Sequence, residues 1–183
     1  MRNLIEKDFK AIISLPPRND TEAEIFSQWD SSGPEEFNFY GQDFIFPKGI
    51  HAEAKAKWIE PEVLLVEIFI EGEIVSSCAR CLAPVSLEIS GNLMYLYSTK
   101  SADSLEEDFG DEEPIELENF GRVLDIGPQI QESIFALLPR KILCNENCKG
   151  LCPSCGKNLN EGPCSCEKEI SDPRLEALKQ FKF

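Results

Sequence analysis

Residues 66–97 read VEIFIEGEIVSSCARCLAPVSLEISGNLMYLY, and their pattern predicts the central pair of strands in this chain. Apolar residues alternate with polar ones on both sides of the central Cys-Ala-Arg-Cys turn at 78–81. A period of two is typical of strands with one buried face. The connection is too short to cross over to a parallel neighbour, so antiparallel pairing is expected. A third alternating run over 50–59 extends the pair to an antiparallel meander.

Weaker patterns precede these strands. A hairpin is expected over 37–46, with Gly41 and Gln42 in its turn, because glycine accepts the backbone angles that tight turns require. The stretch from Asp20 to Pro34 is expected to be an excursion that contains a short helix over 22–29.

A longer helix is predicted before Pro139. Asp125 is a candidate N-cap, Pro128 lies near the first turn, and apolar residues then recur at helical spacing. Pro139 ends the pattern. A second start signal at Asp172 opens a terminal helix that we expect to dock on the body, with a partner-binding helix as the alternative. Its apolar stripe consists of Leu175, Leu178 and Phe181.

Charge and cysteine content divide the chain near Pro139. The 183 residues carry a net charge of −15 at pH 7. Residues 1–138 have a balance of −17 and residues 139–183 one of +2, and six of the eight cysteines follow Pro139. We therefore predict an α+β protein: an acidic body over 1–138, built on an antiparallel β-sheet with one or two packed helices, and a small C-terminal zinc-bound Cys-rich module over 139–183.

The densest negative charge lies over 101–118, which contains nine acidic residues and no basic one. Like charge at this density cannot collapse, so a mobile acidic loop is predicted, with an electrostatic decoy or a clasp for a basic partner as its functional alternatives. The overall balance argues against a protein that coats nucleic acid or an anionic membrane through its overall field.

The cellular compartment follows from what the chain lacks. It has no apolar run of about 18 residues, and its first 20 residues carry charges throughout. Neither a transmembrane helix nor a signal peptide is therefore expected, and no membrane partner. We expect a cytoplasmic protein, in which thiols stay reduced and eight cysteines serve as metal ligands.

The cysteine spacing is typical of zinc. The unit Cys152-Pro-Ser-Cys155-Gly156 is a zinc knuckle, because proline prepares the turn between two thiolates and glycine accepts the positive φ that follows. The pair at 78–81 is a second knuckle. Eight cysteines suffice for two structural Zn2+ ions. Proximity groups them as Cys152, Cys155, Cys164 and Cys166 in a local site, and Cys78, Cys81, Cys144 and Cys148 in a long-range site.

The cysteine spacing is also compatible with other groupings and with other bound groups. Six of them could form one cluster with two bridging thiolates, which leaves Cys78 and Cys81 as a redox pair; an iron–sulfur cluster also uses four thiolates. A catalytic zinc requires an open position and usually histidine or carboxylate ligands, whereas the one histidine, His51, is expected to be a solvated strand residue. We find no phosphate-binding glycine loop and no nucleophile elbow, so the protein is predicted not to be an enzyme.

Two motifs resemble those of the bacterial YceD family. The run CKGLCPSCGKNLN at 148–160, followed by DPRL at 172–175, resembles its C-terminal signature, and CARCL at 78–82 resembles its other motif. The resemblance covers roughly 50–183. The family is described as large ribosomal RNA subunit accumulation proteins, and as metal-binding and candidate nucleic-acid-binding proteins. The resemblance implies a role in ribosomal RNA accumulation and ribosome assembly, and it supplies no catalytic residue.

Two hypotheses follow for the mechanism. In the first, the zinc module touches ribosomal RNA, or a large-subunit assembly intermediate, weakly and in a salt-sensitive way. In the second, the acidic body is an adaptor or chaperone that holds a basic ribosomal protein or a processing enzyme through the acidic residues at 103–118. The candidate RNA-contacting residues are Arg80, Arg140, Lys141, Lys149, Lys157, Asn158 and Asn160.

Overall fold

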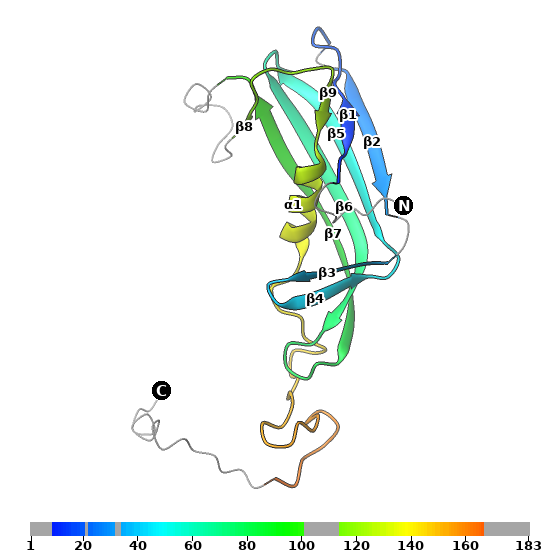
Figure 1. Cartoon of the computed structure of the whole chain (residues 1–183), viewed down its shortest axis with the longest axis vertical. Coiled ribbons are helices and arrows are strands. Elements are labelled where there is room, and N and C mark those ends of the chain that lie inside the picture. The colour runs from blue at the N-terminus through cyan, green and yellow to red at the C-terminus, as the bar shows by residue number, and fades with distance from the viewer. Residues whose placement is uncertain (1–8, 21, 32–33, 101–113, 167–183) are drawn as a thin grey trace, which may run out of the picture.

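The computed structural model describes residues 9–20, 22–31, 34–100 and 114–166. This part of the chain is mostly antiparallel sheet with a single α-helix that lies along one face of the sheet (Figure 1). Its elements are β1 (Ile12–Ser14), β2 (Glu24–Asp30), β3 (Glu35–Phe39), β4 (Gln42–Phe46), β5 (Ile50–Glu60), β6 (Val63–Ser77), β7 (Pro84–Ser98), β8 (Ile115–Glu116), β9 (Val123–Asp125) and α1 (Gly127–Leu137).

The predicted meander is confirmed as the centre of the large sheet. Strands β6 and β7 pair along their whole lengths, from Val63 opposite Ser98 to Ser77 opposite Pro84. On its other side, β6 pairs first with β5 and then, near the hairpin tip, with β4. The sheet order is β2-β5-β6-β4-β3, with β7 on β6 and β8 parallel to the end of β7.

The expected helix over 22–29 is wrong, because this segment forms strand β2 and pairs antiparallel with β5. Its side chains alternate in burial, with Ile25 and Trp29 turned inward and Phe26 between them exposed. A separation of four residues equals two strand periods and is also close to one helical turn. The spacing of Ile25 and Trp29 therefore fits both structures, and pairing with β5 decides between them.

The hairpin is confirmed, but its turn lies one residue earlier than expected. Tyr40 and Gly41 form the two-residue connection, and Gln42 already pairs with Phe39 as the first residue of β4. Both turn residues have positive φ, 51° for Tyr40 and 79° for Gly41. Positive φ at both positions identifies a type I′ turn, whose twist matches that of the strands.

The predicted helix is α1, and it ends at Leu137 as expected from Pro139. The expected N-cap is wrong: Ile126 occupies that position without a side-chain cap. Asp125 instead accepts hydrogen bonds at Oδ1 from the N–H of Ala11 (3.1 Å) and of Gly127 (3.0 Å). Its carboxylate thus ties the N-terminal segment to the start of α1, a contact between residues more than 100 positions apart.

The core lies between α1 and the sheet. Ile126, Ile130 and Ile134 of the helix segment are fully buried and share one cluster with fully buried Ile68 and Ile70 of β6. The end of α1 packs closely on β7, where a Cβ at Gly91 would meet the end of the Leu137 side chain. A glycine at this position of β7 allows the close approach without displacing that side chain.

Several expectations fall at the margins of the described residues. Within the acidic stretch 101–118, residues 101–113 lie outside them, and Ile115–Glu116 forms β8 instead of loop. The expected terminal helix from Asp172 also lies outside them.

In the part of the chain that the structure describes, no helix has the length and hydrophobicity of a membrane-spanning helix. The division at Pro139 stays a prediction; buried Leu138 and Ile142 on either side of it belong to one core.

Candidate metal centres

The eight cysteine sulfur atoms gather in two groups of four, within 4.8 Å of one another in each group. These are the two groups expected from proximity, and Cys78 and Cys81 are not left apart as a pair. All eight thiols are free. We call the groups centre 1, consisting of Cys78, Cys81, Cys144 and Cys148, and centre 2, consisting of Cys152, Cys155, Cys164 and Cys166.

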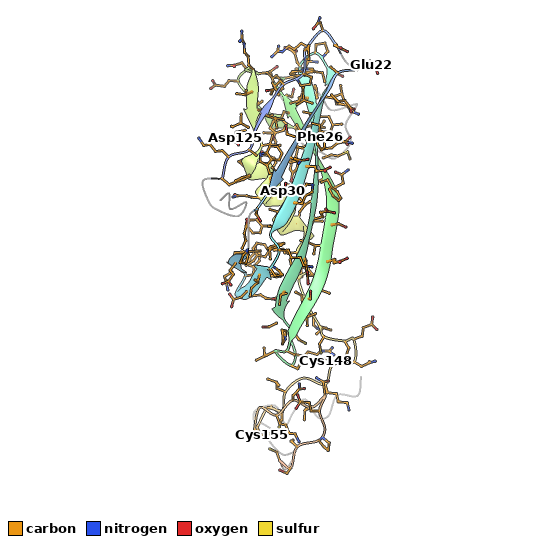
Figure 2. All side chains as sticks on the ribbon, turned by 90° about the vertical axis from the view of Figure 1, so that its right-hand side faces the viewer. Glu22, Phe26, Asp30, Asp125, Cys148 and Cys155 are labelled. Carbon is orange, nitrogen blue, oxygen red and sulfur yellow. The ribbon has the colours of Figure 1, made fainter. Side chains whose placement is uncertain are left out.

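Centre 1 joins the tip of the β6–β7 hairpin to the segment that follows α1. Figure 2 shows Cys148 beside this end of the long strands and Cys155 farther from the sheet. The N–H of Ala79 donates to the carbonyl of Ile142 at 2.8 Å. The Arg80 guanidinium donates to the carbonyls of Glu146 (3.1 Å) and Cys148 (2.9 Å). Two chain segments are thus held together by hydrogen bonds beside the four sulfurs.

The first cysteine pair of each centre has the same backbone geometry. The Cys78 carbonyl accepts from the N–H of Leu82, and the Cys152 carbonyl accepts from the N–H of Gly156, both at 2.9 Å. The N–H of each of these cysteines donates to the carbonyl five residues later at 2.8 Å. Leu82 (φ 60°) and Gly156 (φ 73°) occupy the same position with positive φ. The 78–81 turn is therefore a second knuckle, although leucine replaces the usual glycine.

The sulfur geometry fits a tetrahedral ion. With a Zn–S distance of about 2.3 Å, the sulfurs of a tetrahedral site lie about 3.8 Å apart. The observed separations are 3.8 Å for Cys78–Cys148, 3.6 Å for Cys81–Cys144 and 3.4 Å for Cys152–Cys164. Each group supplies four thiols with no histidine or carboxylate among them, which is the donor set of closed structural sites.

The thiols within each centre differ in acidity. Burial opposes ionisation of Cys78, but N–H groups of Arg80 and Cys81 outweigh it and lower its pKa to about 6. N–H groups of Cys155 and Ser154 lower the pKa of Cys152 to about 6. Hydrogen bonds to Cys148 and Cys81 raise the pKa of Cys144 to about 12. Four thiolates so close together repel one another, and a bound dication would offset that repulsion.

Asn160 links the two centres. Its Nδ2 donates to Sγ of Cys148 at 3.3 Å, and its Oδ1 accepts from the N–H of Lys149 at 2.8 Å. Asn160 lies just beyond the knuckle of centre 2, in a loop closed by the bond from the Leu159 N–H to the Gly150 carbonyl. A side chain from the centre 2 loop therefore orients a sulfur of centre 1.

Four of the seven candidate RNA residues make internal bonds. Arg80 binds two carbonyls as described, and Lys157 Nζ donates to the Pro163 carbonyl at 3.0 Å. Asn158 accepts from the backbone N–H and Nδ2 of Asn160, so both asparagines belong to the turn that braces Cys148. The sequence does not predict this structural role of Asn158 and Asn160. An asparagine that stabilises a turn and an asparagine that binds a ligand look the same in the sequence of a Cys-rich loop.

The other three candidates are available to a ligand. Arg140, Lys141 and Lys149 are exposed. Among the described residues, none of them forms an ion pair, whereas Lys48, Lys57 and Lys100 of the body are each paired with a glutamate. The charges of these three exposed side chains thus remain available to an external partner.

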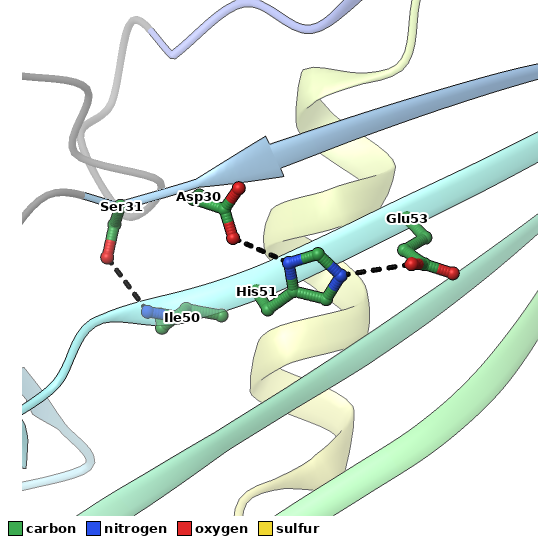
Figure 3. Close-up of polar contacts among 5 residues, drawn as sticks. All are labelled: Asp30, Ser31, Ile50, His51 and Glu53. Atoms are coloured by element: carbon green, nitrogen blue, oxygen red, sulfur yellow. Dashed lines mark hydrogen bonds and ion pairs between the residues drawn. The ribbon is translucent and has the colours of Figure 1, made fainter.

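The one histidine lies away from both centres and is only half-buried. Figure 3 shows His51 on β5 between two carboxylates: Nδ1 is 2.6 Å from Oδ1 of Asp30, and Nε2 is 3.1 Å from Oε1 of Glu53. The expectation of a solvated side chain at position 51 did not include these two carboxylate partners. The bond to Asp30 outweighs partial burial and, with that to Glu53, raises the pKa of His51 above its ordinary value.

This arrangement predicts a pH-dependent stability. A raised folded-state pKa stabilises the protein below the unfolded pKa of about 6.5, and the contribution is lost as pH rises through the folded pKa. Replacement of His51→Gln is expected to lower the free energy of unfolding by up to about 1 kcal/mol at pH 5.5 and by less at pH 8.5. Urea unfolding at both pH values measures this, and Asp30→Asn should reduce the same difference. An equal loss at both pH values would contradict the prediction.

Comparisons with known proteins agree with the motifs. The family model described as large ribosomal RNA subunit accumulation protein YceD matches residues 66–182. Uncharacterized proteins of Mycobacterium tuberculosis and Mycobacterium bovis are 32% identical to this chain over 124 residues, which cover 66% of this chain and 56% of theirs. The chain thus spans little more than half the length of these relatives.

A plant protein supplies a further match. The large ribosomal RNA subunit accumulation protein YCED homolog 1, chloroplastic, of Arabidopsis thaliana is 35% identical over 49 residues, 27% of this chain and 15% of that protein. No solved structure matches the chain. Because the family model covers well over half of the chain, including all eight cysteines, this protein belongs to the YceD family of large ribosomal RNA subunit accumulation proteins.

Proposed function

We propose that this protein is a non-enzymatic zinc-binding factor that supports accumulation of large-subunit ribosomal RNA through direct, weak contact with RNA. The observation that carries the proposal is the pair of four-thiol centres beside three unpaired basic side chains. The family name supports the role in ribosomal RNA accumulation. The four-thiol donor sets support structural ions in place of catalytic ones.

Zinc in these centres would serve the architecture of the RNA-contacting end. In centre 1, the four cysteines would join the hairpin tip to the segment after α1; in centre 2, they would close the loop that carries Lys157 and Asn160. A segment of this size cannot bury enough apolar surface to hold itself together. The bound ions would supply cross-links and neutralise thiolate charge.

The basic residues set the strength of the contact. Three cations that neutralise three phosphates of a single strand give a salt slope of about −2, because each contributes about 0.7. Against a body with a balance of −17, this number of contacts supports modest affinity. Binding is therefore expected at low salt and on RNA regions that the acidic body does not approach.

An acidic groove favours the second candidate, an adaptor for a basic protein. This groove, of about 460 Å3, is lined by four carboxylate-bearing residues among others. The four are Asp30, Glu71, Glu73 and Glu88. Lys48 pairs with Glu73 at 2.6 Å, so part of this charge is compensated within the chain. The groove would suit a lysine or arginine side chain of a ribosomal protein.

Charge reversal separates the two candidates. The double variant Lys141→Glu and Lys149→Glu is expected to reduce RNA crosslinking in growing cells on the order of tenfold, because it converts two phosphate contacts into repulsions. Lys55→Glu, an exposed position on β5, is a control for added negative charge. Unchanged crosslinking, together with recovery of a basic ribosomal protein that is lost on Glu71→Lys, would refute direct RNA contact and favour the adaptor.

A further inference from the structure

An apolar groove of about 530 Å3 lies between the tip of the β3–β4 hairpin and the end of α1. Figure 1 shows this hairpin passing beside the last turn of the helix, on the side of the molecule that leads to the Cys-rich segment. Its volume is within the range of about 300–1,000 Å3 that is typical of small-ligand sites. Its lining includes Phe39, Tyr40, Phe44, Phe135, Leu138 and Arg140.

Aromatic rings form the floor and edge of the groove. Phe39 and Phe135 stack with their centroids 5.0 Å apart and their planes 6° from parallel. Tyr40 meets Phe39 edge to face at 4.6 Å. Phe39 is partly covered by this packing, whereas Tyr40 is 95% exposed. The groove thus presents one exposed aromatic ring, that of Tyr40, next to the stacked rings of Phe39 and Phe135.

Turn geometry does not account for a tyrosine at position 40, and its packing is limited to the edge contact with Phe39. Type I′ turns favour asparagine, aspartate or glycine at this position, because a larger side chain is strained at positive φ. The φ of Tyr40 is 51°, in the left-handed region that is strained for residues with a Cβ. Apart from its edge contact with Phe39, the ring remains exposed to water, so burial does not offset that strain. Strain of this kind in an exposed residue points to a binding role.

The charge at the groove is positive. Arg140 is the one charged residue among the described residues that line it, and Lys141 follows at once. Both are exposed, and neither forms an ion pair in the described part of the chain. An apolar peptide would cover the rings but would leave the guanidinium without a counterion. A nucleotide supplies both a flat ring and a phosphate.

We infer that this groove binds an unpaired base of single-stranded RNA, which stacks on Tyr40 while Arg140 holds an adjacent phosphate. Unpaired bases are commonly held by stacking on aromatic side chains and arginine planes, which a duplex does not allow. The inference rests on the proposed RNA contact and adds to it a preference for single strands. It also extends the RNA surface from the metal centres to the end of α1.

The variant Tyr40→Asn tests the inference, because asparagine suits the turn and removes the ring. The probe is a fluorescein-labelled, unstructured RNA of about 12 nucleotides, with the duplex of the same sequence alongside. In fluorescence anisotropy, the wild-type protein is expected to prefer the single strand. Tyr40→Asn is expected to weaken that binding by about tenfold, the effect of one lost stacked base, and to leave duplex binding unchanged.

Two controls sharpen the result. Phe26→Thr removes an exposed aromatic ring from β2, away from the groove, and should bind the single strand like the wild type. Arg140→Gln should weaken binding and flatten its salt dependence by about 0.7 in the logarithmic slope. Nitration of Tyr40 by tetranitromethane, read by mass spectrometry, should be fast in the free protein and slow in the presence of the single strand.

The outcomes distinguish this inference from the proposal on which it rests. If the wild-type protein binds neither RNA, both are wrong. If Tyr40→Asn binds the single strand like the wild type while Lys149→Glu does not, the groove is not a base site and the RNA contact stands. If Tyr40 is protected from nitration without RNA, and truncation after Cys166 removes that protection, residues 167–183 occupy the groove and the inference fails. If the protection of Tyr40 from nitration increases with protein concentration, a second copy of the chain occupies the groove, and the inference also fails.

Discussion

Replacement of Cys78→Ser is expected to reduce the zinc content of the purified protein from close to two ions per chain to close to one. Cys78 is fully buried, its sulfur lies 3.8 Å from that of Cys148, and the Arg80 N–H is directed at it. A serine hydroxyl cannot replace a thiolate ligand at this position. Structural zinc contributes about 10–16 kcal/mol of apparent binding energy in small zinc domains, so the loss of one ligand has a large effect.

The structural consequence is loss of the link between the hairpin tip and the segment after α1. Limited proteolysis is expected to cut between Lys141 and Lys149 in the variant and not in the metal-loaded wild type. Elemental analysis and thiol titration give the metal content directly. Chelation of the wild-type protein should reproduce the same cleavage, because it removes the ion and leaves the side chains unchanged.

Cys152→Ser is the matched control, since it removes one sulfur of centre 2 by the same chemical change. It should also leave close to one ion per chain. The segment between Lys141 and Lys149 should be cut far more slowly than in Cys78→Ser, and any remaining cleavage should lie near Cys148, where the contact from Asn160 is lost. A wild-type protein with almost no zinc and eight freely titrating thiols would refute both metal centres.

Replacement of Trp58→Ala is expected to lower the free energy of unfolding of the body by about 3–5 kcal/mol. Trp58 on β5 is 2% exposed, and its indole N–H donates to the Pro16 carbonyl at 2.9 Å. Its ring packs edge to face against Phe120 at 4.7 Å, with the Arg18 guanidinium 5.3 Å from its centroid. The substitution removes a large buried side chain and leaves a buried carbonyl unpaired.

Urea unfolding followed by circular dichroism measures this effect. Phe26→Ala, which removes a half-exposed ring from the neighbouring β2, should cost far less. Zinc content should be unchanged in both variants, because Trp58 does not contact either centre. A loss below about 1 kcal/mol in Trp58→Ala would mean that the residues around it do not form the packed core described here.

Features with a local physical cause were predictable from the sequence. The period-two alternation over 66–97 specified the paired strands β6 and β7, since a strand places alternate residues on opposite faces. Pro139 marked the end of α1, because proline cannot extend a helix. The grouping of cysteines followed from the short separations in centre 2, which left the pairs at 78–81 and 144–148 to form centre 1. The strands, the helix end and centre 2 each depend on residues close in sequence, whereas centre 1 was inferred from the cysteines that remained.

Features that depend on distant contacts were not predictable in the same way. The spacing of apolar residues in β2 fits a helix as well as a strand, and its pairing with β5 selects the strand. The position of Asp125 before α1 predicts a helix cap, but its carboxylate accepts from the N–H of Ala11, a contact across the fold that no local pattern indicates. The internal contacts of Arg80 and Asn160, to a backbone carbonyl and to a cysteine sulfur beside centre 1, have no local sequence signal, and their contact with RNA stays a prediction.

The antiparallel meander, the helix before Pro139 and the two knuckles can be read from the residues alone, because strand period, helix end and turn chemistry are properties of short segments. The edge that β2 covers, the internal use of polar side chains and the groove shared by Tyr40 and Arg140 depend instead on contacts between distant segments. Tyr40 and Arg140 are 100 positions apart in the chain. Their proximity arises from packing of the hairpin against α1, an interaction that no local pattern encodes.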